Sequence, residues 1–248
     1  MATYRHLANA PITEAVIDFR VRLPSEFQVK ELSSIRETIH DQYPDSKERR
    51  LITGGFGMEA GKPVVKPPED RGIDGYVLSS ADNRKVAQFS KEGFTFSRLN
   101  PYTHWDDILA EAKNLWELYV AKASPELVTR IAVRYINQLN IPLPIDDFAR
   151  YLTAPPNIPD TIPQVVSHFL TRVVVHDVEI GTTANITQAL QKSLRPGCVT
   201  IILDIDAYKQ KKLGFDDSDI WLTFRQLRDL KNHIFFGSIT EETARLYE

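Results

Sequence analysis

Apolar and polar residues alternate over residues 12–23, the first regular stretch of the chain. One face of such a segment would carry Thr13, Ala15, Ile17, Phe19 and Val21, and the other would carry Glu14, Val16, Asp18, Arg20 and Arg22. This period of two predicts a strand with one buried face. In residues 25–43 the apolar positions recur instead at helical spacing, which predicts a helix directly after the strand.

Glycine and proline dominate the next region. They predict one short strand near Leu51 and a loop over residues 59–74. Three short runs follow at residues 75–81, 85–91 and 93–99, separated by turn residues, and such runs are typical of an antiparallel meander. Residues 102–122 then carry a continuous apolar stripe at helical spacing, which predicts a long helix.

A similar order of elements begins again near residue 126. The pattern predicts a long strand, a short helix, three strands, a long helix and a short final helix, at residues 126–142, 145–155, 164–180, 184–192, 197–210, 217–239 and 238–248. On the second long helix, Ile220, Leu222 or Trp221, Phe224, Leu227 and Leu230 form the expected apolar face. Both halves therefore follow the order strand, helix, antiparallel strands, helix.

The predicted fold class is α+β, with helices collected on one face of antiparallel sheet. Residues 1–124 and 125–248 form the two halves, either as separate units or as one integrated domain. The halves could join edge to edge into one long curved sheet or pack as two sheets. In outline the first arrangement resembles the saddle-shaped folds of the TATA-binding-protein type, an analogy of fold and not of function.

Composition narrows the functional classes. The chain has 248 residues, 42% hydrophobic and 25% charged, with a formal net charge of −3. The chain lacks the excess of basic residues that would favour nucleic acid as a partner. The only cysteine, Cys198, can form neither an intramolecular disulfide nor a cysteine zinc site. Since no apolar run approaches the length of a signal sequence or membrane helix, we expect a cytoplasmic protein without a membrane or cofactor requirement.

Arg130 and Arg134 share one face of the strand predicted at residues 126–142. Glu14 and Asp18 share a face of the first strand at the same spacing. If these two strands lie side by side, carboxylates and guanidiniums can pair across the ladder and hold the register. The alternative is a ligand site in which Arg130, Arg134 and Tyr135 face an anion between the two halves.

Metal and catalytic signals are weak. Asp204 and Asp206 share a strand face and are the only metal candidates, yet no nuclease-like spacing follows them. The six histidines show no metal-ligand spacing, so we expect solvated or hydrogen-bonded roles for His6, His40, His104, His168, His176 and His233. No nucleophile motif marks an enzyme.

Several stretches resemble a known family. "LANAPITEAVIDFRV", "GFTFSRLNPYTHWDDILAEAKNLWELY", "VTRIAVRYINQLNIP" and "LRDLKNHIFFGSITEE" are similar to a sporadically distributed prokaryotic family of roughly 250-residue proteins with no established activity. The resemblance spans nearly the whole chain and implies no catalytic residues. A patchy distribution implies mobile genes, such as those of defence or toxin–antitoxin systems.

Three functions follow as hypotheses. The first is a non-enzymatic interaction module with a protein partner, a second copy of the chain included. The second is a sensor that binds a small molecule or anion between the two halves. The third is a metal-dependent nuclease that uses Asp204 and Asp206.

Overall fold

The computed structural model describes residues 1–59, 62–213 and 218–248. Its strands form one nine-stranded antiparallel sheet in the order β2-β3-β4-β5-β1-β6-β9-β8-β7. The strands are β1 (Ile12–Arg22), β2 (Asp45–Glu59), β3 (Lys62–Ser79), β4 (Lys85–Ser90), β5 (Gly93–Leu99), β6 (Leu127–Pro142), β7 (Leu170–Asp177), β8 (Thr182–Lys192) and β9 (Cys198–Leu213). The predicted α+β class is confirmed, and the halves form one continuous curved sheet.

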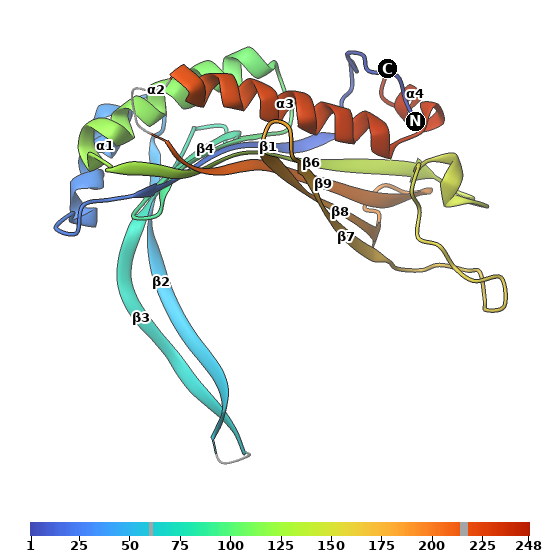
Figure 1. Cartoon of the computed structure of the whole chain (residues 1–248), viewed down its shortest axis with the longest axis horizontal. Coiled ribbons are helices and arrows are strands. Elements are labelled where there is room, and N and C mark those ends of the chain that lie inside the picture. The colour runs from blue at the N-terminus through green and yellow to red at the C-terminus, as the bar shows by residue number, and fades with distance from the viewer. Residues whose placement is uncertain (60–61, 214–217) are drawn as a thin grey trace.

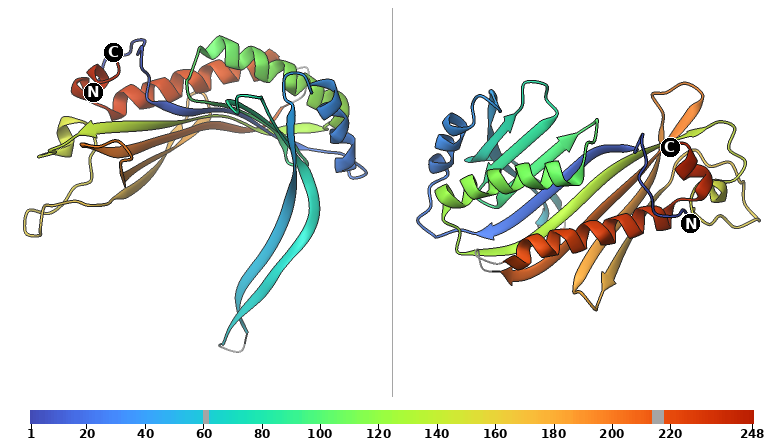
Figure 2. Two further views of the ribbon diagram at one scale, coloured as in Figure 1. Left: turned by 180° about the vertical axis from the view of Figure 1, so that it is seen from behind. Right: turned by 90° about the horizontal axis from the view of Figure 1, so that it is seen from above.

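The helices cover one face of this sheet (Figure 1). They are α1 (Ser33–Thr38), α2 (Trp105–Ala123), α3 (Ser218–Ser238) and α4 (Glu241–Arg245), with 3₁₀ turns η1 (Val29–Leu32) and η2 (Phe148–Arg150). Seen from above, α2 lies over the N-terminal half and α3 over the C-terminal half, while the opposite face of the sheet, here called the underside, carries no helix (Figure 2). None of the helices in the described part of the chain has the length and apolar character needed to cross a bilayer.

The first strands of the two halves meet at the centre. β1 pairs antiparallel with β6, with Ile17 opposite Val133 and Asp18 opposite Ala132. From this seam the other strands run outward, β5 to β2 on one side and β9 to β7 on the other. The described halves are not equivalent, because they contribute five and four strands and the three-residue η2 stands where the first half has α1. An internal repeat therefore stays a prediction.

An aromatic cluster under the two long helices joins the halves on the covered face. Phe19 of β1 stacks on Trp116 of α2, with ring centroids 4.0 Å apart and planes 7° apart. Phe224 of α3 packs on the same Phe19 ring at 5.0 Å. Phe19 and Phe224 are fully buried. One side chain of the central strand thus contacts a helix from each half, which places both helices over the seam.

Of the loop expected over residues 59–74, positions 60 and 61 lie outside the described residues and the other positions are strand instead. β2 and β3 form a long hairpin that projects from the underside (Figure 1). Residues 75–79 of β3 pair with β4, whereas the rest of β3 pairs with β2 alone. Proline is tolerated in a strand whose outer N–H groups have no partner, and Pro67 and Pro68 fall near a register shift. The glycines and prolines of this region therefore led to the prediction of a loop, although they lie in paired strands.

Other predicted elements are shorter than expected. The helix expected over residues 145–155 is reduced to η2, and the one over 25–43 is divided into η1 and α1. The strand expected over 164–180 is confined to β7. The prolines at positions 155, 156, 159 and 163 lack the backbone N–H that a helix or strand needs as a donor. Regular structure therefore resumes only at β7.

Candidate functional site

The two arginines of β6 lie on the underside, where carboxylates already engage them. Arg130 donates to Asp18 of β1 at 2.9 Å and to both oxygens of Asp206 of β9 at 2.9 Å. Arg134 makes a two-pronged contact with Asp204, at 2.9 Å from Nε and 2.6 Å from Nη2. These hydrogen bonds raise the pKa of Arg134 above its usual value. β6 is thereby tied to both of its neighbours by charge-assisted hydrogen bonds.

Further polar side chains complete this network. Thr95 donates to Asp18 at 2.7 Å, and Asn185 donates to Asp206 at 3.2 Å. The partner of Arg134 is Asp204 and not Glu14, which contributes a weaker attraction after those of Asp204 and Asp206. Because the guanidiniums face carboxylates, the underside supports register and offers no free cationic pair at this point.

Tyr135 does not share this surface with the arginines. It is 1% exposed and lies on the helix-covered face, where its hydroxyl is 3.2 Å from that of Tyr102. A ligand on the underside cannot contact it, because successive residues of a strand point to opposite faces. The structure therefore does not bring Arg130, Arg134 and Tyr135 together around one anion.

The proposed metal ligands, Asp204 and Asp206, are already hydrogen-bonded to other side chains. The oxygens of Asp204 are bonded to Arg134, and those of Asp206 to Arg130 and Asn185. Within the described ranges, no cluster of three or more His, Cys, Asp or Glu side chains is placed to hold a metal ion. A cation at this position would compete with guanidiniums, so the geometry gives the nuclease hypothesis no support.

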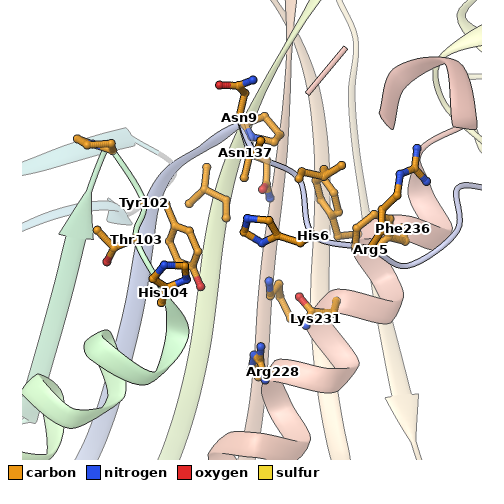
Figure 3. A pocket seen from close by; sticks show the side chains of 18 of the residues that line it. Arg5, His6, Asn9, Tyr102, Thr103, His104, Asn137, Arg228, Lys231 and Phe236 are labelled. Carbon is orange, nitrogen blue, oxygen red and sulfur yellow. The ribbon is translucent and has the colours of Figure 1, made fainter. Parts of the chain in front are cut away.

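A cleft of about 1000 Å³ opens on the other face, between the two halves. Three segments line it: an N-terminal arm (residues 4–12), the connection between β5 and α2 (residues 100–107) and one side of α3 (residues 228–236). Figure 3 shows side chains of all three segments around the same space. A volume of this size lies at the upper end of the range for small-molecule sites.

Contacts with the C-terminal segment hold the arm in place. Ala2 N–H donates to the carbonyl of Ile239 at 2.8 Å, and Asn9 N–H donates to that of Tyr247 at 2.9 Å. Arg5 bridges to Glu241 at 2.9 Å and to Glu248 at 2.7 Å. The bonds from Arg5 lower the pKa of Glu241 to about 2. The arm thus forms a fixed wall of the cleft, and the charge of Arg5 is neutralised by its glutamates.

Lys231 of α3 is the most unusual group in the cleft. It is 7% exposed, and its Nζ sits 3.7 Å from the ring centroid of Tyr135. Within the described part of the chain, no carboxylate or carbonyl oxygen accepts a hydrogen bond from this amine. Burial, with added repulsion from Arg228, lowers the pKa of Lys231 to about 7. A buried ammonium next to an aromatic ring is costly, and amines with such strongly shifted pKa values cluster at functional sites of proteins.

Other lining groups add to the positive character. Arg228 lies one turn before Lys231 and stacks over Trp105 with its guanidinium carbon 5.7 Å from the ring centroid. The N-cap of α2 is His104, whose side chain makes no capping hydrogen bond. α2 therefore begins at the cleft without a side-chain cap, and its first turn also carries the carboxylates of Asp106 and Asp107. Asp107 is the one acidic residue among the lining residues that the structure describes.

The sequence contained one signal for this site that its pattern analysis missed. Ile220, Phe224, Leu227, Lys231 and Ile234 follow helical spacing, and all five are buried. A lysine thus occupies a position of the apolar stripe, whereas Leu230, expected there, is only partly buried. Neither His6 nor His104 carried any such signal, because they meet only through the fold.

A scan of the chain against models of protein families finds no match, and a search of the curated proteins finds none either. The family resemblance drawn from the sequence stays a prediction. The cleft and its lysine are therefore the observations from which a function is argued.

Replacing Arg130 should cost far more stability than replacing Arg134. The Arg130→Met variant leaves the carboxylate of Asp18, whose side chain is 10% exposed, without its main partner. We expect a loss of about 2–4 kcal/mol in the free energy of unfolding. The side chain of Arg134 is 48% exposed, so Arg134→Met should change stability by about 1 kcal/mol or less. Urea denaturation measures both, and equal losses would contradict the structural assignment.

Lys231→Met should make the protein more stable at neutral pH. The Lys231 amine has a pKa of about 7 when folded against 10.5 in an exposed state. Between these values the unfolded chain binds a proton that the folded chain does not, so wild-type stability rises with pH. Below pH 7 both states are protonated and the full burial cost, roughly 5 kcal/mol, is present.

The measurement is urea denaturation at several pH values from 6 to 10. The difference between wild type and Lys231→Met should shrink as pH rises through this window. Lys113→Met is the matched control, because Lys113 also lies over an aromatic ring, that of Trp221, but is exposed on α2. Parallel curves for wild type and Lys231→Met would show that the amine is not buried as a cation.

Proposed function

We propose that this protein binds a small anionic molecule in the cleft between its two halves, as a ligand sensor or carrier and not as an enzyme. The observation that carries the proposal is Lys231, a buried amine that lines a large cleft and has no anionic partner among the residues that the structure describes. Folding pays for its desolvation and receives only a cation–π contact in return. An anion in the cleft supplies the missing partner.

The surroundings of Lys231 support an anion over a neutral ligand. Arg228 lies next to it on α3, and the uncapped start of α2 faces the same space. Helix N-termini favour negative charge through their free N–H groups. Asn137, which is 2% exposed, lines the floor and donates to the carbonyl of Leu203 at 2.9 Å. Cations and backbone donors from both halves thus converge on one volume.

Binding an anion here also couples the two halves. The cleft wall formed by residues 100–107 belongs to the first half, and the wall with Arg228 and Lys231 belongs to the second. A ligand that contacts both walls stabilises their relative position, because it binds the folded arrangement and not the separated elements. This coupling is the physical basis on which such a protein can report the presence of its ligand.

Sulfate at millimolar concentration is a suitable probe, because its charge is constant between pH 6 and 9. We expect it to raise the melting temperature of the wild type more at pH 6.5 than at pH 8.5, where Lys231 loses its proton. Lys231→Met should lose this specific increment, whereas Lys113→Met should keep it. Because sulfate stabilises proteins in general, the comparison with Lys113→Met separates this general effect from binding at the cleft. Equal responses of wild type and Lys231→Met would reject the proposed site.

A second candidate function rests on edge strand β7. Leu170, Val173 and Val174 are 67%, 55% and 47% exposed there. At the opposite edge, the base of β2 carries the charged run Asp45–Arg50, which discourages strand pairing. An apolar edge of this kind fits strand addition by a partner protein, a second copy of this chain included. A subunit of a defence or toxin–antitoxin-like system stays the sequence-based expectation for this candidate.

Native mass spectrometry on protein purified gently from its own host tests this candidate. A bound partner should be lost in Val174→Lys, because a charge on the apolar edge opposes strand addition. Val165→Lys is the control, since Val165 is 95% exposed but lies outside β7. A partner that remains bound to Val174→Lys would place the interaction elsewhere, and a chain that carries no partner in the wild type would remove the candidate.

A further inference from the structure

Two histidine rings lie close to each other, with nearly parallel planes, at the cleft. His6 comes from the N-terminal arm and His104 from the start of α2, and both line the cleft. Their ring centroids are 6.3 Å apart, and their planes differ by 24°. Both side chains are exposed. Figure 3 shows them beside Lys231 and Arg228 of α3. The cleft therefore combines a pair of flat rings with a cationic wall.

The spacing of the rings is close to what an inserted planar ring needs. Stacked aromatic rings lie about 3.5 Å apart, so a third ring between two others needs roughly 7 Å. The observed spacing falls short by less than about 1 Å by this estimate. Because both histidines are exposed, small side-chain rotations can supply that difference.

We propose that the anion bound in the cleft is a nucleoside phosphate, with its base between His6 and His104 and its phosphate at Lys231 and Arg228. This inference rests on the proposed function and names the ligand class of the same site. The base gains stacking on both faces, and the phosphate becomes the partner that the buried amine lacks. Thr103 also lines the cleft and supplies a hydroxyl for the sugar.

Other small anions fit the site less completely. A sugar phosphate satisfies Lys231 and Arg228 but leaves the facing rings of His6 and His104 unused. A nucleoside without phosphate uses the rings but leaves the buried ammonium unpaired. A single-stranded nucleic acid would need a longer basic track, whereas the underside arginines are engaged by carboxylates. A mononucleotide is the class that uses both features of the cleft.

Isothermal titration calorimetry on the full chain at pH 6.5 separates these possibilities. The probes are adenosine monophosphate and guanosine monophosphate, with ribose 5-phosphate as the anion without a base and adenosine as the base without a phosphate. We expect a mononucleotide to bind on the order of tenfold or more tightly than either fragment. His104→Ala and His6→Ala should weaken mononucleotide binding on the order of tenfold and leave ribose 5-phosphate unchanged. His40→Ala, at an exposed site of the first half, is the matched control.

The possible failures point to different conclusions. If ribose 5-phosphate binds as tightly as the mononucleotides, and the histidine variants bind like the wild type, the nucleotide class is wrong while the anion site stands. If no phosphate compound binds, and Lys231→Met behaves like the wild type toward sulfate, the proposed function itself is wrong. His6 and His104 are exposed and His104 caps α2 with no side-chain hydrogen bond, so these variants should keep the fold.

Discussion

The antiparallel pairing of β1 with β6 sets the position of nearly everything else in the molecule. It converts two halves into one sheet and brings α2 and α3 to the same face. On the covered face, the Phe19 ring contacts Trp116 and Phe224, one from each half. On the underside, Arg130 bonds to carboxylates of β1 and β9. Apolar packing on one face and charge pairing on the other thus define a single register for the same ladder.

The cleft is a consequence of that seam. α2 begins and α3 passes beside the junction of the halves, and the N-terminal arm closes the space because its backbone is bonded to the C-terminal segment. The buried amine of Lys231 opposes folding at this place, since desolvation destabilises its charged form. Binding sites commonly contain groups that lower the stability of the folded protein, and a buried lysine at a cleft is such a group.

The two faces of the sheet therefore differ in their chemistry. Underside cations are matched by carboxylates at hydrogen-bonding distance, as in the pairs of Arg130 with Asp206 and Arg134 with Asp204. Among the described residues, the cations of the cleft are not matched in this way, apart from Arg5 at its edge. In the sequence, Arg130 and Arg134 are conspicuous because they interrupt an apolar strand. The lysine that lacks a partner was less visible, although it interrupts an apolar stripe in the same manner.

Periodicity in the sequence was enough to predict β1, α2, α3 and β6, because each has one buried face and a long, regular pattern. It was also enough to place Arg130 and Arg134 on one face of their strand, from the period of two alone. It did not reveal the β2–β3 hairpin, because strand pairing there depends on a partner strand and not on local propensity. The cleft was equally hidden. His6, His104 and Lys231 come from the beginning, middle and end of the chain, and only the packing of arm and helices across the seam brings them together.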